Sequence, residues 1–259
     1  MLATLVPAYS HGESTSSDWQ WGATVYLWLP TLGGETSFPS GGGTPSIDIG
    51  VDDFLDSINF IFMGALEGHR GRWGLSTDVI YLDLGASETK TRDLTIGQIE
   101  LPASVNADAR FDLRGWLWTV AGSYTVLRQE NLSMDVLAGA RLLDLQEDLM
   151  WTFEGDLSSL PLGGASGSSQ AGDSHWDGIV GVKGRAVLGA ERNWFLPYHL
   201  DVGTGESDFT WQGMIGLGYS FDSIEILGVW RYLDYELGSS TQIESLNLNG
   251  PALGVTFRF

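Results

Sequence analysis

Apolar and polar residues alternate strictly along the last segment of the chain. Leu253, Val255, Phe257 and Phe259 fall on one face, and Ala252, Gly254, Thr256 and Arg258 fall on the other. Successive side chains of a β-strand point to opposite sides, so one face is apolar and the other is small or polar. A strand between lipid and a polar barrel interior has this pattern. The segment therefore predicts a membrane-spanning strand whose lipid face consists of those four apolar residues.

Nine further segments show the same period of two. They are residues 19–29, 59–69, 73–81, 116–126, 134–142, 176–188, 194–203, 209–220 and 224–232. The phase is weakest in the last of these, because Leu227 and Val229 also fall on the inward side. The pattern predicts an all-β chain that forms a single antiparallel transmembrane β-barrel of ten strands, with eight or twelve as alternatives. Twelve would follow if 46–50 also spans, and 52–58 breaks the β pattern and predicts one helical turn.

Short and long connections alternate between these segments. Residues 69–72, 128–131, 190–193 and 222–223 are tight turns, whereas the segments near 30–58, 85–110, 155–174 and 238–249 are long and polar. Outer-membrane barrels have short periplasmic turns and long extracellular loops. Aromatic residues gather at both ends of the strands, as in the two interfacial girdles of such barrels. We therefore expect both termini in the periplasm.

Composition narrows the class of protein further. The chain has 259 residues, no Cys and a net charge of -20. The absence of Cys excludes disulfides and thiolate metal sites. A strongly acidic surface repels phosphate, which argues against nucleic acid as a partner. No run approaches the ~18 consecutive apolar residues that a spanning helix needs.

The first residues form a segment of a different kind. Residues 1–10 contain a short apolar run followed by Ala8 and Ser10, which fit a secretory cleavage site, although the basic start of a signal peptide is missing. We expect residues 1–18 to be a signal-peptide remnant or a disordered tail, with a mature start near His11. Residues 19–259 then form the barrel domain.

Two segments and the terminal Phe259 resemble a broad, functionally uncharacterised group of bacterial outer-membrane β-barrel proteins. The segments are residues 62–75 and 228–235, and the likeness extends over about 19–259. The resemblance implies residence in the bacterial outer membrane and contact with its lipid and lipopolysaccharide. It also implies that the barrel assembly machinery reads Leu253, Val255, Phe257 and Phe259 as an assembly signal. It carries over no catalytic residue.

Inward parity gathers charged residues inside the predicted barrel. The acids are Glu67, Asp78, Asp135, Asp177, Asp201 and Glu225, and the bases are Arg141, Lys183, Arg185, Arg231 and Arg258, with His69 and His199 beside them. Buried charges must pair, so we expect a structural network that largely plugs the lumen. The alternative is that the same groups line a narrow pore for small solutes or a proton relay.

Enzymatic barrels provide a competing hypothesis. The chain has only His11, His69, His175 and His199. His199 and Asp201 share a parity and could pair, and His175 with Asp173 is the candidate near the outer rim. No Ser stands out beside either His. We therefore predict a non-enzymatic barrel without a cofactor or resident metal, and keep a rim hydrolase of lipid or peptide as the alternative.

Acidic clusters in the predicted loops suggest one further alternative, a surface-binding protein. The clusters are Asp52, Asp53 and Asp56 in one loop and Glu147 and Asp148 in another. Neither has the spacing of an EF-hand. We expect at most weak binding of divalent cations there, and the sequence leaves the oligomeric state open.

Overall fold

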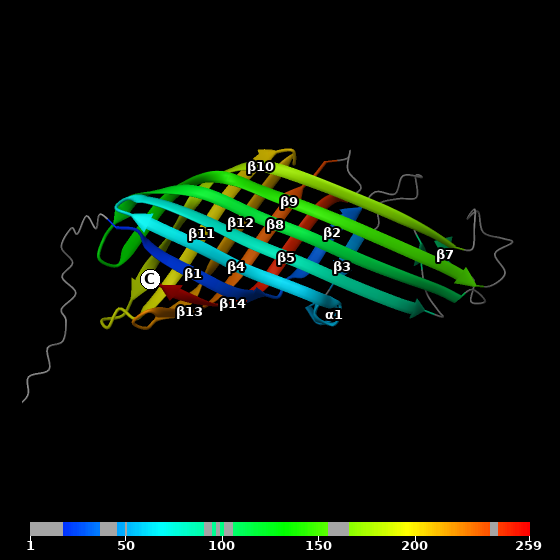
Figure 1. Cartoon of the computed structure of the whole chain (residues 1–259), viewed down its shortest axis with the longest axis horizontal. Coiled ribbons are helices and arrows are strands. Elements are labelled where there is room, and N and C mark those ends of the chain that lie inside the picture. Colours follow the sequence, from blue (N-terminus) through cyan, green and yellow to red (C-terminus); the bar gives the residue numbers. More distant parts are fainter. Residues whose placement is uncertain are drawn as a thin grey trace, which may run out of the picture.

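Ten strands form a closed antiparallel barrel (Figure 1). The computed structural model describes residues 18–36, 46–49, 51–90, 95–96, 99–100, 106–154, 166–238 and 243–259, so most of the expected N-terminal tail lies outside the described residues. The barrel strands are β1 (Gln20–Trp28), β4 (Ile58–Arg70), β5 (Trp73–Lys90), β8 (Asn106–Arg128), β9 (Leu132–Glu154), β10 (Ser166–Leu188), β11 (Trp194–Gly205), β12 (Phe209–Ser220), β13 (Ile224–Glu236) and β14 (Ile243–Arg258). Each strand pairs with its neighbour in chain order, and β1 pairs with β14 to close the ring. The predicted ten-stranded barrel is confirmed.

Two short strands and one helix extend this framework. Strand β2 (Thr31–Thr36) continues β1 past Leu29 and Pro30 and pairs with the outer part of β14. Strand β3 (Ser46–Ile49) pairs with β2 alone, and α1 (Val51–Asp56) follows it. The segment 46–50 thus adds no barrel strand, and the helical turn predicted at 52–58 is present. Strands β6 (Thr95–Ile96) and β7 (Ile99–Glu100), of two residues each, pair with each other in a sheet separate from that of the barrel.

Among the described residues, no helix has the length and apolarity needed to cross a bilayer.

The outer surface of the barrel is apolar on its strands and aromatic at both ends. Side chains of outward parity are exposed, for example Val25, Ile215 and Leu253 at 61%, 56% and 70%. One aromatic level lies beside the short turns and includes the contacts Trp73–Tyr124, Trp194–Tyr219 and Tyr219–Phe221. A second level includes Tyr81–Trp116, Trp118–Trp176 and Trp211–Tyr232. This band between two girdles is the lipid-facing belt of a transmembrane barrel.

Four strands run far beyond this belt. Strands β8, β9 and β10 each have 23 residues and β5 has 18, whereas a spanning strand needs only about 9–11 residues. At about 3.3 Å per residue, a 23-residue strand is about 75 Å long. Figure 1 shows β5, β8, β9 and β10 continuing past the other strands, at the end opposite the C-terminus and the short turns.

This projecting sheet corrects the prediction of plain loops at 85–110 and 155–174. Much of both segments is strand, because β5 stays paired with β8 up to Lys90–Ala107 and β10 stays paired with β9 from Ser166–Thr152. The pairs extend each hairpin by its own backbone hydrogen bonds, which do not require an apolar face. A polar, Gly-rich and Ser-rich sequence therefore concealed the strands from a search for alternating apolar residues.

Val255 tests the lipid-facing assignment. It lies on the outward face of β14, four residues before the terminal Phe259, and pairs with Val25 and Ile226. We expect Val255→Arg to lower the free energy of unfolding by roughly 2–4 kcal/mol, the cost of an Arg near the bilayer midplane. The measurement is denaturant unfolding in liposomes.

Val255→Ile is the matched control, because it keeps an apolar branched side chain at the same position. Deletion of Phe259 should separately reduce the yield of barrel in the outer membrane. Equal stability of Val255→Arg and Val255→Ile would show that this face does not meet lipid.

Candidate functional site

A buried ion pair, Arg141 with Asp201, lies at the centre of the barrel interior. The Nη2 atom of Arg141 donates to both carboxylate oxygens of Asp201, at 2.8 and 2.7 Å, and neither side chain is exposed to solvent. His199 Nε2 lies 2.6 Å from the same carboxylate, and Arg141 Nε donates to Thr119 at 3.2 Å. The predicted pairing of His199 with Asp201 is present in the structure.

Strands β10 and β11 approach each other closely at Asp201. Gly181 is the partner of Asp201 in the register of β10 and β11. A Cβ atom at Gly181 would lie 2.3 Å from the carbonyl oxygen of Leu200 and 2.7 Å from the Cα of Asp201. Any larger residue would push β11 away, so glycine is required for the close approach of the two strands.

A second cation, Arg231 on β13, extends the network across the lumen. It donates to the Gln212 side-chain oxygen at 3.1 and 2.7 Å, to the Tyr26 hydroxyl at 3.0 Å and to Asp78 at 3.4 Å. Tyr26 in turn donates to Asp78 at 2.8 Å, and the amide of Gln212 reaches Asp201 at 3.5 Å. Four steps around the ring separate β13 from β5, which carries Asp78. Side chains from nearly opposite walls therefore meet.

An apolar cluster lies inside the barrel on the outer side of the charged network. Trp28, Met63, Ile80, Leu117, Leu143, Leu233, Tyr235 and Leu248 form one cluster, each 7% exposed or less, with further residues packed against it. Arg231 lies over the Trp28 ring at 4.8 Å, so the charged network adjoins this cluster. The sequence prediction assigned closure to charges alone and missed this layer. The inward-facing Leu227 and Val229 of the weakly phased strand were the one sign of this apolar cluster in the sequence pattern.

A third group of luminal side chains lies nearer the short turns. Lys183 on β10 contacts Glu67 on β4 at 2.9 Å across the lumen, and Glu67 also contacts His69. Arg185 and Arg258 both contact Glu225, at 2.8 and 2.7 Å. Glu67 and His69 keep 44% and 29% of their side-chain surface exposed, so water reaches this end of the lumen.

Among the described residues, the predicted Asp177 and Asp135 take part in none of these ion pairs. Asp177 is buried on β10 and accepts the backbone N–H of Ser207 at 3.0 Å. Asp135 is buried on β9. One of its carboxylate oxygens, one carboxylate oxygen of Glu67 and one ring nitrogen of His69 all lie within 4.8 Å of one another. Among the described residues, this is the one group of His, Asp and Glu side chains close enough to hold a metal ion.

The rim candidate does not assemble as catalytic machinery. His175 and Ser207 are buried, at 7% and 2% exposure, and neither ring nitrogen of His175 has a hydrogen bond within the described chain. Asp173 lies two residues before His175 on β10 and is exposed. A hydrolase needs a nucleophile within hydrogen-bond reach of its base, and among the described residues no side chain hydrogen-bonds to His175.

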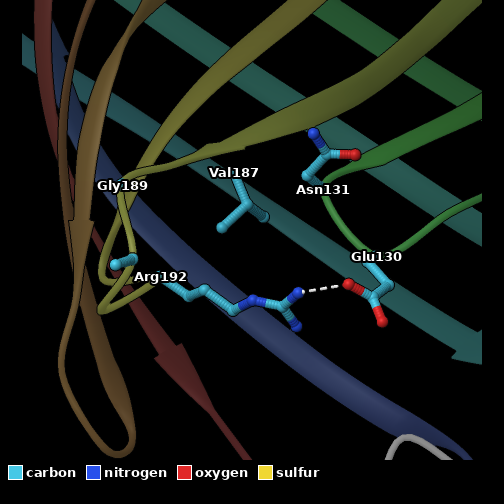
Figure 2. A pocket seen from close by; sticks show the side chains of 6 residues that line it. Glu130, Asn131, Val187, Gly189 and Arg192 are labelled. Atoms are coloured by element: carbon cyan, nitrogen blue, oxygen red, sulfur yellow. Dashed lines mark hydrogen bonds and ion pairs between the residues drawn. The ribbon is translucent and has the colours of Figure 1, made fainter.

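A shallow depression lies among the short turns (Figure 2). Glu130 and Asn131 line it from the turn between β8 and β9, and Gly189 and Arg192 line it from the turn between β10 and β11. Arg192 contacts Glu130 at 2.8 Å, and the exposed fractions of these two side chains are 40% and 79%. The ion pair links two neighbouring turns at the surface, and the depression holds no apolar recess for a ligand.

Comparison with known proteins places the fold and goes no further. No family model and no curated protein matches the chain. Among solved structures, the outer membrane protease OmpT from Escherichia coli is 8% identical and aligns with a TM-score of 0.51 over 96% of this chain and 99% of that one. The translocator domain of the autotransporter NalP from Neisseria meningitidis is 16% identical, with a TM-score of 0.44 over 95% and 90%. Ail of Yersinia pestis is 9% identical, with a TM-score of 0.32 over 93% and 98%.

At such identity the likeness concerns the fold alone. Together with the closed sheet and the apolar belt, it confirms the predicted architecture of a bacterial outer-membrane β-barrel. Protease activity is a property of OmpT, and it does not carry over to this chain.

Removal of Arg141 tests the central ion pair. Arg141→Ala leaves the Asp201 carboxylate buried beside His199 without its main partner, so we expect a loss of about 3–5 kcal/mol in the free energy of unfolding. The double variant Arg141→Met, Asp201→Leu removes both charges and should recover most of that loss, because apolar side chains of similar size replace a buried pair at little cost. Denaturant unfolding in liposomes measures both.

Arg192→Ala is the control, because it removes an exposed ion pair worth less than about 1 kcal/mol. A loss in Arg141→Ala no larger than in Arg192→Ala would contradict a dry, buried pair.

Proposed function

We propose that this chain is a non-enzymatic outer-membrane barrel with a closed lumen, and that it acts at the cell surface through the sheet projecting from β5, β8, β9 and β10. The observation that carries the proposal is the side-chain filling of the lumen. The narrow-pore hypothesis requires a continuous water path past Arg141 and Arg231, yet these side chains are 0% and 4% exposed. The hydrolase hypothesis requires an accessible nucleophile hydrogen-bonded to His175, yet His175 is buried and no described side chain hydrogen-bonds to its ring.

Two different layers support closure. The layer of Arg141, Asp201, Gln212, Arg231 and Asp78 spans the lumen by hydrogen bonds. The apolar cluster around Trp28 and Leu233 fills the outer part. An ion entering from either end would have to displace paired charges or enter an apolar layer, and both are costly.

The projecting sheet supports action at the surface. It extends well past the length that a bilayer requires of a strand. Residues 147–171, in the β9–β10 hairpin, contain four acidic residues and no basic residue. We propose that this hairpin binds divalent cations, which would bridge it to the phosphate groups of lipopolysaccharide. On α1, the side chains of Asp52 and Asp56 are exposed and could contribute. The structure does not describe the side chains of Asp53, Glu147 and Asp148.

Planar-bilayer recording tests closure. The wild-type barrel should show no large, steady conductance. Arg231→Ala should stay closed to ions, because Trp28, Leu233 and Tyr235 still fill the outer layer. Adding Leu233→Ala and Trp28→Ala to Arg231→Ala removes large side chains from both layers and should raise conductance. The Leu233→Ala, Trp28→Ala pair with Arg231 intact is the matched control. Steady wild-type conductance would overturn the closed-barrel proposal.

Calcium binding tests the surface role. The variant for this test joins Gly85 to Asp112 and Gln146 to Gly172 by short turns, which cut each hairpin at a pair of register partners. It retains the barrel and should remain closed to ions. Calorimetry should show weak calcium binding to the full chain and little to the shortened variant. Equal heats of calcium binding from the two proteins would show that the projecting sheet does not bind calcium.

A further inference from the structure

Three side chains with metal-binding atoms converge inside the barrel near its periplasmic end. Glu67 and His69 are two residues apart on β4 and therefore share its inward face. Asp135 reaches them from β9, three steps around the ring. One ligand atom from each residue lies within 4.8 Å of the other two. Residues that are far apart in sequence and on different strands thus form one compact cluster.

Asp135 has no partner that would explain its position. It is 8% exposed, and among the described residues its carboxylate makes no hydrogen bond or ion pair. Lys183 is its register partner on β10, yet the ammonium group contacts Glu67 at 2.9 Å instead. A carboxylate at a site this little exposed, beside a second carboxylate, is stabilised by a nearby cation, because an opposite charge offsets the repulsion between the two acids. Lys183 and His69 both contact Glu67, and neither makes an ion pair with Asp135.

We propose that Glu67, His69 and Asp135 form a binding site for a divalent transition-metal ion of the Zn²⁺ class. One imidazole nitrogen and two carboxylate oxygens are ligands that suit Zn²⁺, and three protein ligands leave a fourth position for water. Mg²⁺ and Ca²⁺ prefer sites made of oxygen alone. The partial exposure of Glu67 and His69 gives the ion a route from the periplasmic opening.

Lys183 affects the affinity of the site for a metal ion. Its ammonium group contacts Oε1 of Glu67, so the Oε2 atom remains for a metal. The lysine charge repels the ion and weakens binding without blocking it. A bound metal would join β4 to β9 directly across the lumen and add a cross-link at the end of the barrel where water enters.

Zinc titration of the chelator-treated full chain in detergent tests the site. Calorimetry should show one Zn²⁺ per barrel, and the melting temperature should rise with zinc concentration because the ion binds the folded state. Mg²⁺ and Ca²⁺ at the same concentration should produce a much smaller rise. The variant with the shortened projecting sheet should bind zinc normally, which separates this site from calcium binding at the surface.

Three variants and one control locate the ion. Asp135→Asn and His69→Gln should each weaken zinc binding by at least about tenfold, the loss seen when even outer-shell partners of metal sites are removed. His175→Gln is the control, because it removes another buried histidine outside the cluster. Lys183→Met should tighten binding by removing the competing charge. Without zinc, Asp135→Asn should be at least as stable as wild type, since it removes an unpaired buried charge.

The outcomes that would overturn the proposal are equally specific. Absence of zinc binding to the wild type is one. Unchanged affinity in both Asp135→Asn and His69→Gln would place the ion elsewhere. Two results together would show that Asp135 and Lys183 form a structural pair and that no metal site exists. One is a zinc-free Asp135→Asn barrel less stable than the wild type, and the other is a Lys183→Met barrel that does not bind zinc.

Discussion

The structure depends on the pairing of β1 with β14. In a bilayer every backbone N–H and C=O group must be hydrogen-bonded within the protein, so a sheet can span only if it has no open edge. The register from Gly22–Arg258 to Trp28–Ala252 removes the last edge. Two backbone hydrogen bonds between Trp21 and Phe259 complete the seam at the periplasmic end. Strand β14 thus closes the barrel by pairing with β1.

Closure with ten strands determines what the interior can contain. A ring of this size lies between small filled barrels and wide porins, so long side chains from nearly opposite walls can touch. Arg231 reaches Asp78, and Lys183 reaches Glu67, each over four steps around the ring. The interior then follows the rules of a protein core, in which charges pair and the remaining space is filled by apolar side chains. Paired charges occupy the middle and the periplasmic end, and an apolar cluster occupies the outer part.

The sequence predicted the strands and their inward faces because both follow from a period of two. It could not predict which charges meet, since parity gives the face of a strand but not the height of a residue along the barrel. Arg231 and Asp78 are 153 residues apart, and only the register of the intervening strands brings them together. The apolar layer was missed because inward residues such as Leu233 look like irregularities in an alternating pattern. The projecting strands were missed because their pairing rests on backbone hydrogen bonds outside lipid.

A filled lumen can be tested directly because the chain contains no Cys. Leu233→Cys places one thiol in the outer layer, where the native side chain is 0% exposed, and Glu67→Cys places one at the water-accessible end, where the side chain is 44% exposed. Each folded barrel in liposomes would be treated with a small, charged, water-soluble thiol reagent. The account predicts rapid labelling at Glu67→Cys and protection at Leu233→Cys until the barrel is unfolded. Rapid labelling of Leu233→Cys in the folded barrel would show an open, hydrated lumen and contradict the central claim.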